Sequence, residues 1–148
     1  MQDLWRITDI RKSKYNSQKC EYDGIIFDSK MEMEYYRDYV IPRIESGEIV
    51  KCDRQVRYEL QPSFNYNGKR ERAIEYVSDF DLTYSDGSFV VVDVKGMVKP
   101  MDNLKRKMFE YRYPDIKLEW IGKSLIDGGW VTLDVIKQGR KERRKVRC

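Results

Sequence analysis

Residues 78–96 read SDFDLTYSDGSFVVVDVKG, and in this stretch two β-prone runs meet at the short segment Ser85-Asp86-Gly87. If this segment is a three-residue loop with its glycine in the left-handed conformation, Phe80 lies opposite Val92 and the other apolar side chains of the two strands match as well. A loop of two or four residues would instead place Phe80 opposite Asp93. Hydrophobic matching therefore predicts an antiparallel hairpin with the three-residue loop, between a strand at 73–84 and a strand at 88–95.

The same register brings two acidic side chains together. Asp79 lies directly across from Asp93, and Lys95 lies on the same face one pair further along. Cross-strand partners have Cβ atoms about 4.5–5.5 Å apart, close enough for two carboxylates to share one hard cation such as Mg²⁺. The alternative is that both acids lie on a solvated face at the sheet margin, with Lys95 in an ordinary ion pair. Asp81 shares the face of Asp79 but lies opposite Val91, at a distance from Lys95, and we expect it to be solvated or to act only indirectly.

A third carboxylate is selected by helical geometry. The sequence predicts a helix that starts at Ser29 and stops near Gly47, with a kink or a break at Pro42. At 100° per residue, Glu32 falls on the apolar side of this helix and points inward. Ser29 and Glu32 also have the spacing of a capping box, in which the glutamate closes the first helical turn. Capping and the positioning of a metal or a water both remain open for Glu32.

The residues that follow the hairpin predict the remaining strands and helices of the fold. A strand at 88–95, a helix at 101–112 and a strand at 116–120 form a βαβ unit with parallel strands and a right-handed crossover. The apolar stripe of the helix is predicted to comprise Met101, Leu104, Met108 and Tyr111. The segment 130–145 is ambiguous between strand and helix, but its length and the spacing of Trp130, Leu133 and Ile136 favour a helix that runs into the basic C-terminal tail. We expect an α/β fold, in which an antiparallel hairpin feeds the βαβ crossover of a mixed central sheet flanked by helices.

Composition excludes several classes of protein. The 148 residues contain no histidine, which removes histidine-dependent nucleophiles and zinc sites that use imidazole. The three cysteines form no C-x-x-C pair, and no glycine-rich nucleotide-binding loop is present. No apolar run is long enough to cross a membrane and the N-terminus lacks a secretory signal, so we expect a cytoplasmic protein. The kinds of catalysis that the composition does not exclude use carboxylates, lysine or hard metal ions.

Basic residues gather at the C-terminus, although the net charge is only +4. Residues 137–148, KQGRKERRKVRC, hold seven basic side chains and one acidic one. Such a run is either a solvated tail or the electrostatic footprint of a polyanion such as nucleic acid. On the 101–112 helix, Lys105 is the best candidate for a phosphate contact, because its helix directly follows the strand that carries Asp93. The candidate DNA-binding residues are Lys105, Arg106, Arg140, Lys141, Arg143 and Arg144.

Three motifs together resemble the PD-(D/E)xK nuclease superfamily, which has the restriction-endonuclease-like fold. They are a helical glutamate in F-D-S-K-M-E at 27–32, an aspartate in Y-V-S-D-F at 76–80, and D-V-K-G at 93–96, which ends a valine-rich strand. Ser78 replaces the proline of the family pattern, and Asp93 replaces its common glutamate. Small phage-encoded endonucleases of the junction-resolving endonuclease I type are especially similar. The similarity extends over roughly residues 20–125.

This resemblance implies a metal-dependent DNA endonuclease. It implies that Asp79 and Asp93 ligate Mg²⁺ or Mn²⁺ together with the Val94 carbonyl, and that Glu32 holds a second metal or its water. Lys95 would orient or deprotonate the attacking water, or stabilise charge on the phosphate. The implied substrate is DNA, including branched DNA such as a Holliday junction, and the implied assembly is a homodimer in the cytoplasm, that of the host if the chain is phage-encoded.

Two other functions remain open beside the endonuclease. One is a non-catalytic module that binds nucleic acid on the same fold, and the other is an RNA-processing nuclease with the same metal site. For all three we expect one domain with two appendages. These parts are a flexible N-terminal arm at 1–19, a nuclease domain at 20–136 and a basic C-terminal tail at 137–148.

Overall fold

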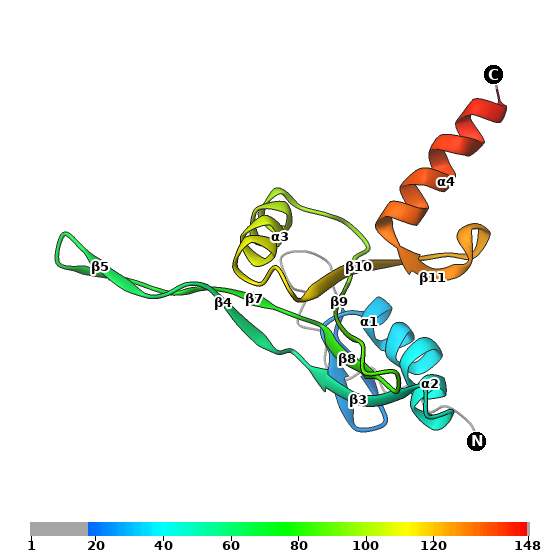
Figure 1. The fold of residues 1–148 in the computed structure, drawn as a ribbon, viewed down its shortest axis with the longest axis horizontal. Coiled ribbons are helices and arrows are strands. Elements are labelled where there is room, and N and C mark those ends of the chain that lie inside the picture. The colour runs from blue at the N-terminus through cyan, green and yellow to red at the C-terminus, as the bar shows by residue number, and fades with distance from the viewer. Residues whose placement is uncertain (1–17, 148) are drawn as a thin grey trace.

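A five-stranded mixed sheet lies at the centre of the computed structural model, which describes residues 18–147 (Figure 1). Strands β9 and β10 run parallel, and the other neighbours are antiparallel. In order across the sheet, the strands are β11 (Gly129–Thr132), β10 (Lys117–Ser124), β9 (Phe89–Val94), β8 (Phe80–Tyr84) and β3 (Ile49–Arg54). The fold is α/β, as the sequence predicts. Residues 1–17 of the expected N-terminal arm lie outside the described part of the chain.

The hairpin between β8 and β9 has the predicted register. Phe80 pairs with Val92, and Leu82 pairs with Val90. Gly87 in the connecting loop has a φ of 87°, the left-handed conformation that glycine adopts without steric cost. Matching of apolar side chains across the pair was therefore sufficient to fix which residues face each other.

The sequence predicts one continuous strand over residues 73–84, and this prediction is wrong. The segment is divided into β7 (Ile74–Val77) and β8, and β7 leaves the central sheet to pair with β4 (Arg57–Gln61). The division lies at Ser78, which is fully buried. Its backbone N–H donates to the Val56 carbonyl (3.0 Å), and its hydroxyl donates to Asp81 (2.7 Å). These hydrogen bonds take the place of those that Ser78 would form with a neighbouring strand if the strand were continuous.

A helical segment covers one face of the sheet. It consists of α1 (Lys30–Tyr35), a π-helical turn η1 (Tyr36–Val40) and α2 (Ile41–Glu45). The helical conformation continues through Pro42, and the predicted interruption takes the form of the wide turn η1 just before this proline, which offers no backbone donor. A short hairpin of β1 (Cys20–Tyr22) and β2 (Ile25–Phe27) packs beside α1. The buried side chains of this face include Phe27, Met33, Tyr35, Val40, Phe80, Leu82, Val90 and Val92.

Helix α3 (Pro100–Arg112) lies on the opposite side of the sheet and completes the expected βαβ unit (Figure 1). The predicted apolar stripe is mostly wrong, because only Met108 of its four residues packs against the core beneath the helix. Phe109 is the fully buried side chain of the helix, whereas Met101 is 59% exposed and Tyr111 is 91% exposed. Phe109 packs against the rings of Tyr58 and Tyr76, with centroids 5.1 and 5.2 Å away. This aromatic cluster determines which side of α3 faces the sheet.

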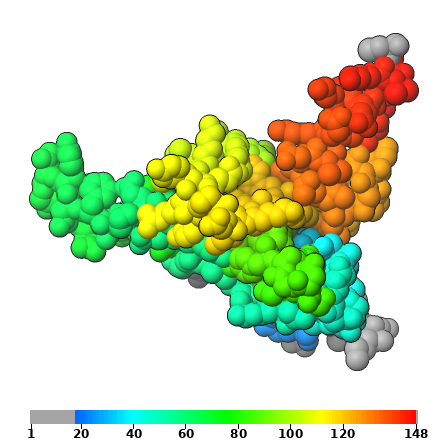
Figure 2. All heavy atoms as spheres, viewed as in Figure 1, coloured from blue at the N-terminus to red at the C-terminus, as the bar shows by residue number. Residues whose placement is uncertain are grey.

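The C-terminal segment begins as a strand. Trp130 lies in β11 and packs edge-on against Tyr35 at 5.3 Å, so the helix predicted from Trp130 starts only at α4 (Leu133–Val146). The expected basic tail is thus mostly helical, and α4 projects from the body (Figures 1 and 2). Arg143 pairs with Asp127 at 2.7 Å, which ties α4 to the short turn η2 (Leu125–Asp127).

A two-stranded arm, residues 57–77, projects from the other end of the molecule (Figures 1 and 2). Strands β4 and β7 form its base, and β5 (Phe64–Tyr66) and β6 (Lys69–Glu71) form its tip. Asn67 and Gly68 have φ values of 50° and 73°, as the tight turn between β5 and β6 requires. We call this element the β-arm. No helix within residues 18–147 has the length and apolar character needed to cross a membrane.

Candidate active site

Two carboxyl groups meet where β7 ends and β9 approaches its C-terminus. The Asp79 amide donates to the Val92 carbonyl (3.1 Å), and Oδ2 of Asp79 accepts from the Val94 amide (2.7 Å). These two hydrogen bonds continue the antiparallel pairing of β8 and β9 beyond Phe80 and Val92, the last residue pair of the two strands. The Asp79 carboxyl lies close to that of Asp93, a residue that is only 7% exposed. Burial and the neighbouring Asp93 raise the pKa of Asp79 to about 10.

Lys95 lies beside this acidic pair. Its Nζ is 3.1 Å from Oδ2 of Asp93 and 3.2 Å from Oδ1 of Asp102, and it lies 5.6 Å from the centroid of the Trp120 ring. Burial by itself lowers the pKa of Lys95, but Asp93 and Asp102 outweigh this effect and hold its pKa above the ordinary value. The side chain is therefore an ammonium group fixed between two carboxylates.

Glu32 lies near the pair, on the first turn of α1. Its backbone amide donates to the Ser29 hydroxyl (3.1 Å), so Ser29 caps the helix as the sequence predicts. The Glu32 side chain is 9% exposed. Burial, followed by the charges of Asp28 and Asp93, raises the pKa of Glu32 to about 7 against the opposing hydrogen bond from Ser29. Glu32 thus lies within electrostatic reach of Asp93.

Sequence patterns missed three side chains that support the site. The Tyr76 hydroxyl donates to Oδ2 of Asp93 (2.6 Å), and the indole N–H of Trp120 donates to the Tyr76 hydroxyl (3.0 Å). Asp102, in the first turn of α3, accepts from the Lys99 amide (2.8 Å) while it pairs with Lys95. Of the three, only Asp102 could have been recognised from the sequence. An acidic residue in the first turn of a helix is a capping signal, and this helix begins shortly after the end of β9.

The expectation of a solvated Asp81 is wrong. Its side chain is buried and accepts hydrogen bonds from the hydroxyls of Ser78 and Tyr58. The two hydroxyls compensate for the loss of water around the carboxylate. Asp81 therefore stabilises the chain where β7 leaves the central sheet, which is also where Asp79 is positioned.

The donor chemistry of this site fits a hard divalent cation. Asp79, Asp93 and Glu32 offer carboxylate oxygens and Val94 offers a carbonyl, and Mg²⁺ takes oxygen ligands, often only one or two carboxylates with water and phosphate. Within residues 18–147, no three acidic or cysteine side chains already converge as a complete metal-binding group. The structure brings Asp79, Asp93 and Lys95 together and leaves Glu32 beside them.

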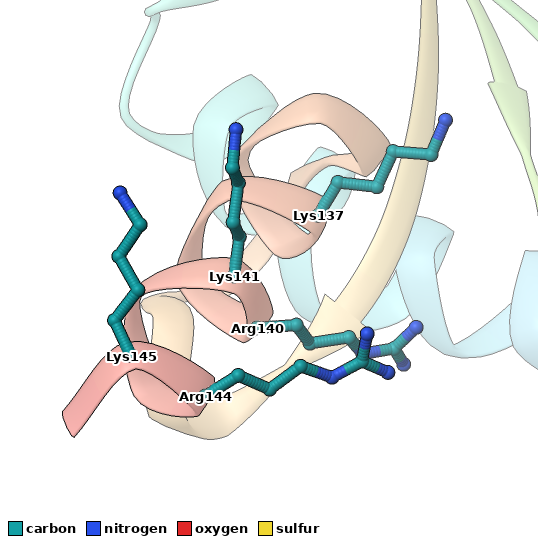
Figure 3. Close-up of a pocket in the computed structure, with 5 residues that line it drawn as sticks. All are labelled: Lys137, Arg140, Lys141, Arg144 and Lys145. Carbon is teal, nitrogen blue, oxygen red and sulfur yellow. The ribbon is translucent and has the colours of Figure 1, made fainter. Parts of the chain in front are cut away.

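Three of the four basic candidates of α4, namely Arg140, Lys141 and Arg144, lie on one exposed face. Lys137, Arg140, Lys141, Arg144 and Lys145 line a shallow pocket of about 600 Å³ (Figure 3). Arg140 and Arg144, from successive turns, extend in the same direction. Lys137 and Lys145 were not among the residues that the sequence indicated as candidates.

The remaining basic candidates lie elsewhere. Arg143 is turned toward η2 by its pair with Asp127. On α3, Arg106 pairs with Glu110 at 2.8 Å and lies 5.5 Å from the Trp120 ring centroid, whereas Lys105 lies partly buried beside it. Arg106 also lines a cleft of about 750 Å³ between α3, β10 and α4.

Comparison with known proteins places the chain in one family. Residues 12–127 match the family described as "Protein of unknown function (DUF1064)", and the chain belongs to this family. No curated protein matches the chain, and neither does any solved structure.

Proposed function

We propose that this member of the DUF1064 family is a DNA endonuclease that uses Mg²⁺ or Mn²⁺ to hydrolyse phosphodiester bonds. The observation that carries the proposal is the contact between the Asp79 and Asp93 carboxyls beside the ammonium group of Lys95. Two buried acids in contact are costly unless a proton or a cation lies between them. A divalent cation would remove this cost and would at the same time attract a phosphate.

Each residue of the site would have its own part in the reaction. When bound, the metal would act as a Lewis acid and activate water. Asp79, Asp93 and the Val94 carbonyl would hold it. Lys95 is kept charged by Asp93 and Asp102, which favours stabilisation of the negatively charged phosphate over the removal of a proton. Glu32 would hold a second metal or the attacking water.

Binding of DNA would depend on the basic face of α4. Its exposed lysines and arginines would contact phosphates without regard to sequence, so affinity should fall steeply with salt. Branched DNA is the substrate that we propose in particular. Because a junction requires cuts on two opposed strands, we also propose that two copies of the chain act together.

A non-catalytic module that binds nucleic acid is the second candidate. It is favoured by one observation, that no three acidic side chains within residues 18–147 converge as they stand. In that case Asp93, Lys95 and Asp102 would form a buried ion-pair network that supports the fold. An RNA-processing nuclease would use the same site and differs only in its substrate.

One experiment separates these functions. The protein is incubated with supercoiled, linear and four-way-junction DNA, and with RNA, in Mg²⁺, Mn²⁺ or EDTA. We expect cleavage of DNA with either metal and none in EDTA. We expect Asp79→Asn and Asp93→Asn to abolish cleavage while metal-free binding to DNA is retained. Cleavage of RNA alone would assign the RNA nuclease, and binding without cleavage of any substrate would assign the binding module.

A further inference from the structure

The β-arm ends in a tip that no other part of the described chain covers. All residues from 62 to 70 are exposed, and Tyr66 is 68% exposed. A two-stranded hairpin with neither face covered is marginally stable in water by itself. The arm base is supported by Tyr58, Tyr76 and Phe109, but this cluster does not extend to the tip. The tip is therefore a surface without a partner in the monomer.

The chemistry of the tip is basic and aromatic. Residues 62–72 contain three basic side chains, Lys69, Arg70 and Arg72, and one acidic side chain, Glu71. Neither Lys69 nor Arg72 forms an ion pair with any residue between 18 and 147, and Arg70 donates only to the Ser63 hydroxyl. The positive charge of the tip is thus uncompensated.

Cross-strand pairing sorts these side chains between the two faces. Tyr66 lies opposite Lys69, and Asn65 lies opposite Arg70. Because partners in an antiparallel pair share a face, Asn65 and Arg70 project together on one side, while Tyr66 and Lys69 project on the other. Arginine and asparagine are the side chains that form paired hydrogen bonds with the base edges of guanine and adenine.

We infer that the tip of the β-arm lies in the major groove of duplex DNA, as a second DNA contact remote from the acidic pair. This inference rests on the proposed function for its choice of DNA. A two-stranded ribbon has the width that the major groove admits. Lys69 and Arg72 contact phosphates at the groove edge, and Arg70 and Asn65 face the bases.

Charge argues against a second copy of the chain as the occupant. Two arms that paired tip to tip would bring together surfaces with three basic side chains and one acidic one each, and like charges repel. Strands β5 and β6 also have only three residues each, which offers a short edge for pairing with another strand. A polyanion matches the tip better than another arm does.

The test measures binding to duplex DNA in EDTA, where neither metal nor cleavage is needed. Lys69→Ala and Arg72→Ala should each reduce the slope of log K against log [salt] by about 0.9, and together by about 1.8. Lys51→Ala removes a comparably exposed lysine from β3 and serves as the matched control, with no change in slope expected. A chain in which an Asn-Gly turn joins Gln61 directly to Ile74 removes the tip, since these two residues already face each other.

Chemical protection then locates the tip. Wild-type protein should protect guanine N7, which lies in the major groove, from methylation by dimethyl sulfate, and the protection should be lost in Arg70→Ala and in the chain without the tip. Unchanged slopes and unchanged N7 protection in these variants would overturn the inference, even if the wild type cleaves DNA. Loss of self-association in light scattering, without loss of N7 protection, would assign the tip to a second copy and also overturn it. Loss of protection in a protein that never cleaves DNA would support the arm and refute only the nuclease.

Discussion

Tyr76 donates a 2.6 Å hydrogen bond to Oδ2 of Asp93, the same oxygen that lies 3.1 Å from Nζ of Lys95. Trp120 donates in turn to the Tyr76 hydroxyl at 3.0 Å. Strands β7, β9 and β10 therefore cooperate in holding a single carboxylate. The orientation of Asp93 depends on side chains outside any sequence motif, and its donors belong to the proposed catalytic site as positioning residues.

Loss of the Tyr76 hydroxyl should weaken the metal site. We expect Tyr76→Phe to lower Mn²⁺ affinity or cleavage about 10- to 100-fold, because supporting hydrogen bonds fix the orientation of metal ligands. Rates measured over a Mn²⁺ titration would check this, with thermal unfolding as the control for folding. Tyr111→Phe changes a tyrosine that is 91% exposed and should alter neither property. Equal Mn²⁺ dependence in the two variants would remove Tyr76 from the site.

Removal of one acid should stabilise the metal-free protein. An asparagine in Asp79→Asn still accepts from the Val94 amide and needs no proton to lie beside Asp93, whereas the wild type must protonate Asp79 when it folds at neutral pH. We therefore expect a gain of about 1–3 kcal/mol at neutral pH in EDTA. The pKa of Asp79 is raised from its ordinary value of 3.8 to about 10, so its favourable contribution is complete below pH 4 and is lost as the pH rises. The gain should therefore be absent near pH 3 and grow toward pH 9.

Urea unfolding at several pH values measures this dependence. The wild type should lose stability relative to Asp79→Asn as the pH rises. A difference that is independent of pH, or a destabilised variant at pH 9, would show that the two carboxyls do not repel in the native protein.

Lys95 should contribute to the rate of cleavage more than to the binding of metal. We expect Lys95→Ala to reduce cleavage about 10²- to 10⁴-fold while Mn²⁺ affinity stays the same or rises, because a cation that competes for Asp93 has been removed. The matched control is Lys123→Ala, which removes an ion pair to Glu34 instead. If Lys95→Ala lost Mn²⁺ affinity and activity in parallel, Lys95 would act only by supporting Asp93.

Two substitutions on α3 test which side of this helix packs against the sheet. Phe109→Ala should destabilise the protein by about 3–5 kcal/mol, because Phe109 is fully buried among Tyr58, Tyr76 and Tyr113. Leu104→Ala should change the free energy of unfolding by less than about 0.5 kcal/mol, since Leu104 is more than half exposed. The opposite ranking in chemical denaturation would restore the stripe that the sequence predicts.

The hairpin of β8 and β9 could be predicted because its apolar side chains match in only one register. The contact of Asp79 with Asp93 follows from the same local pairing. Ser29 and Pro42 likewise marked the start and the break of the helical segment through local chemistry, namely a hydroxyl that accepts from the first turn and a missing backbone donor. Features set by neighbouring residues were therefore accessible from the sequence.

Features set by distant contacts were not accessible. Strand β3 pairs with β8 as an edge of the sheet, but its sequence IVKCDR alternates too weakly to predict it. The packed side of α3 is chosen by Tyr58 and Tyr76, about 30 to 50 residues away in the chain. The hydrogen bonds from Tyr76 and Trp120 to the site arise because β7 leaves the central sheet, a change of direction that a continuous β-prone run conceals.

The proposed metal site can be tested by binding of Mn²⁺ to the free protein, measured by electron paramagnetic resonance for the wild type, Asp79→Asn and Asp93→Asn. If Asp79 and Asp93 hold the metal, the wild type binds at least one Mn²⁺ per chain and each substitution weakens this binding at least tenfold, with the fold retained. Equal Mn²⁺ binding by all three proteins, or none by the wild type, would contradict this assignment.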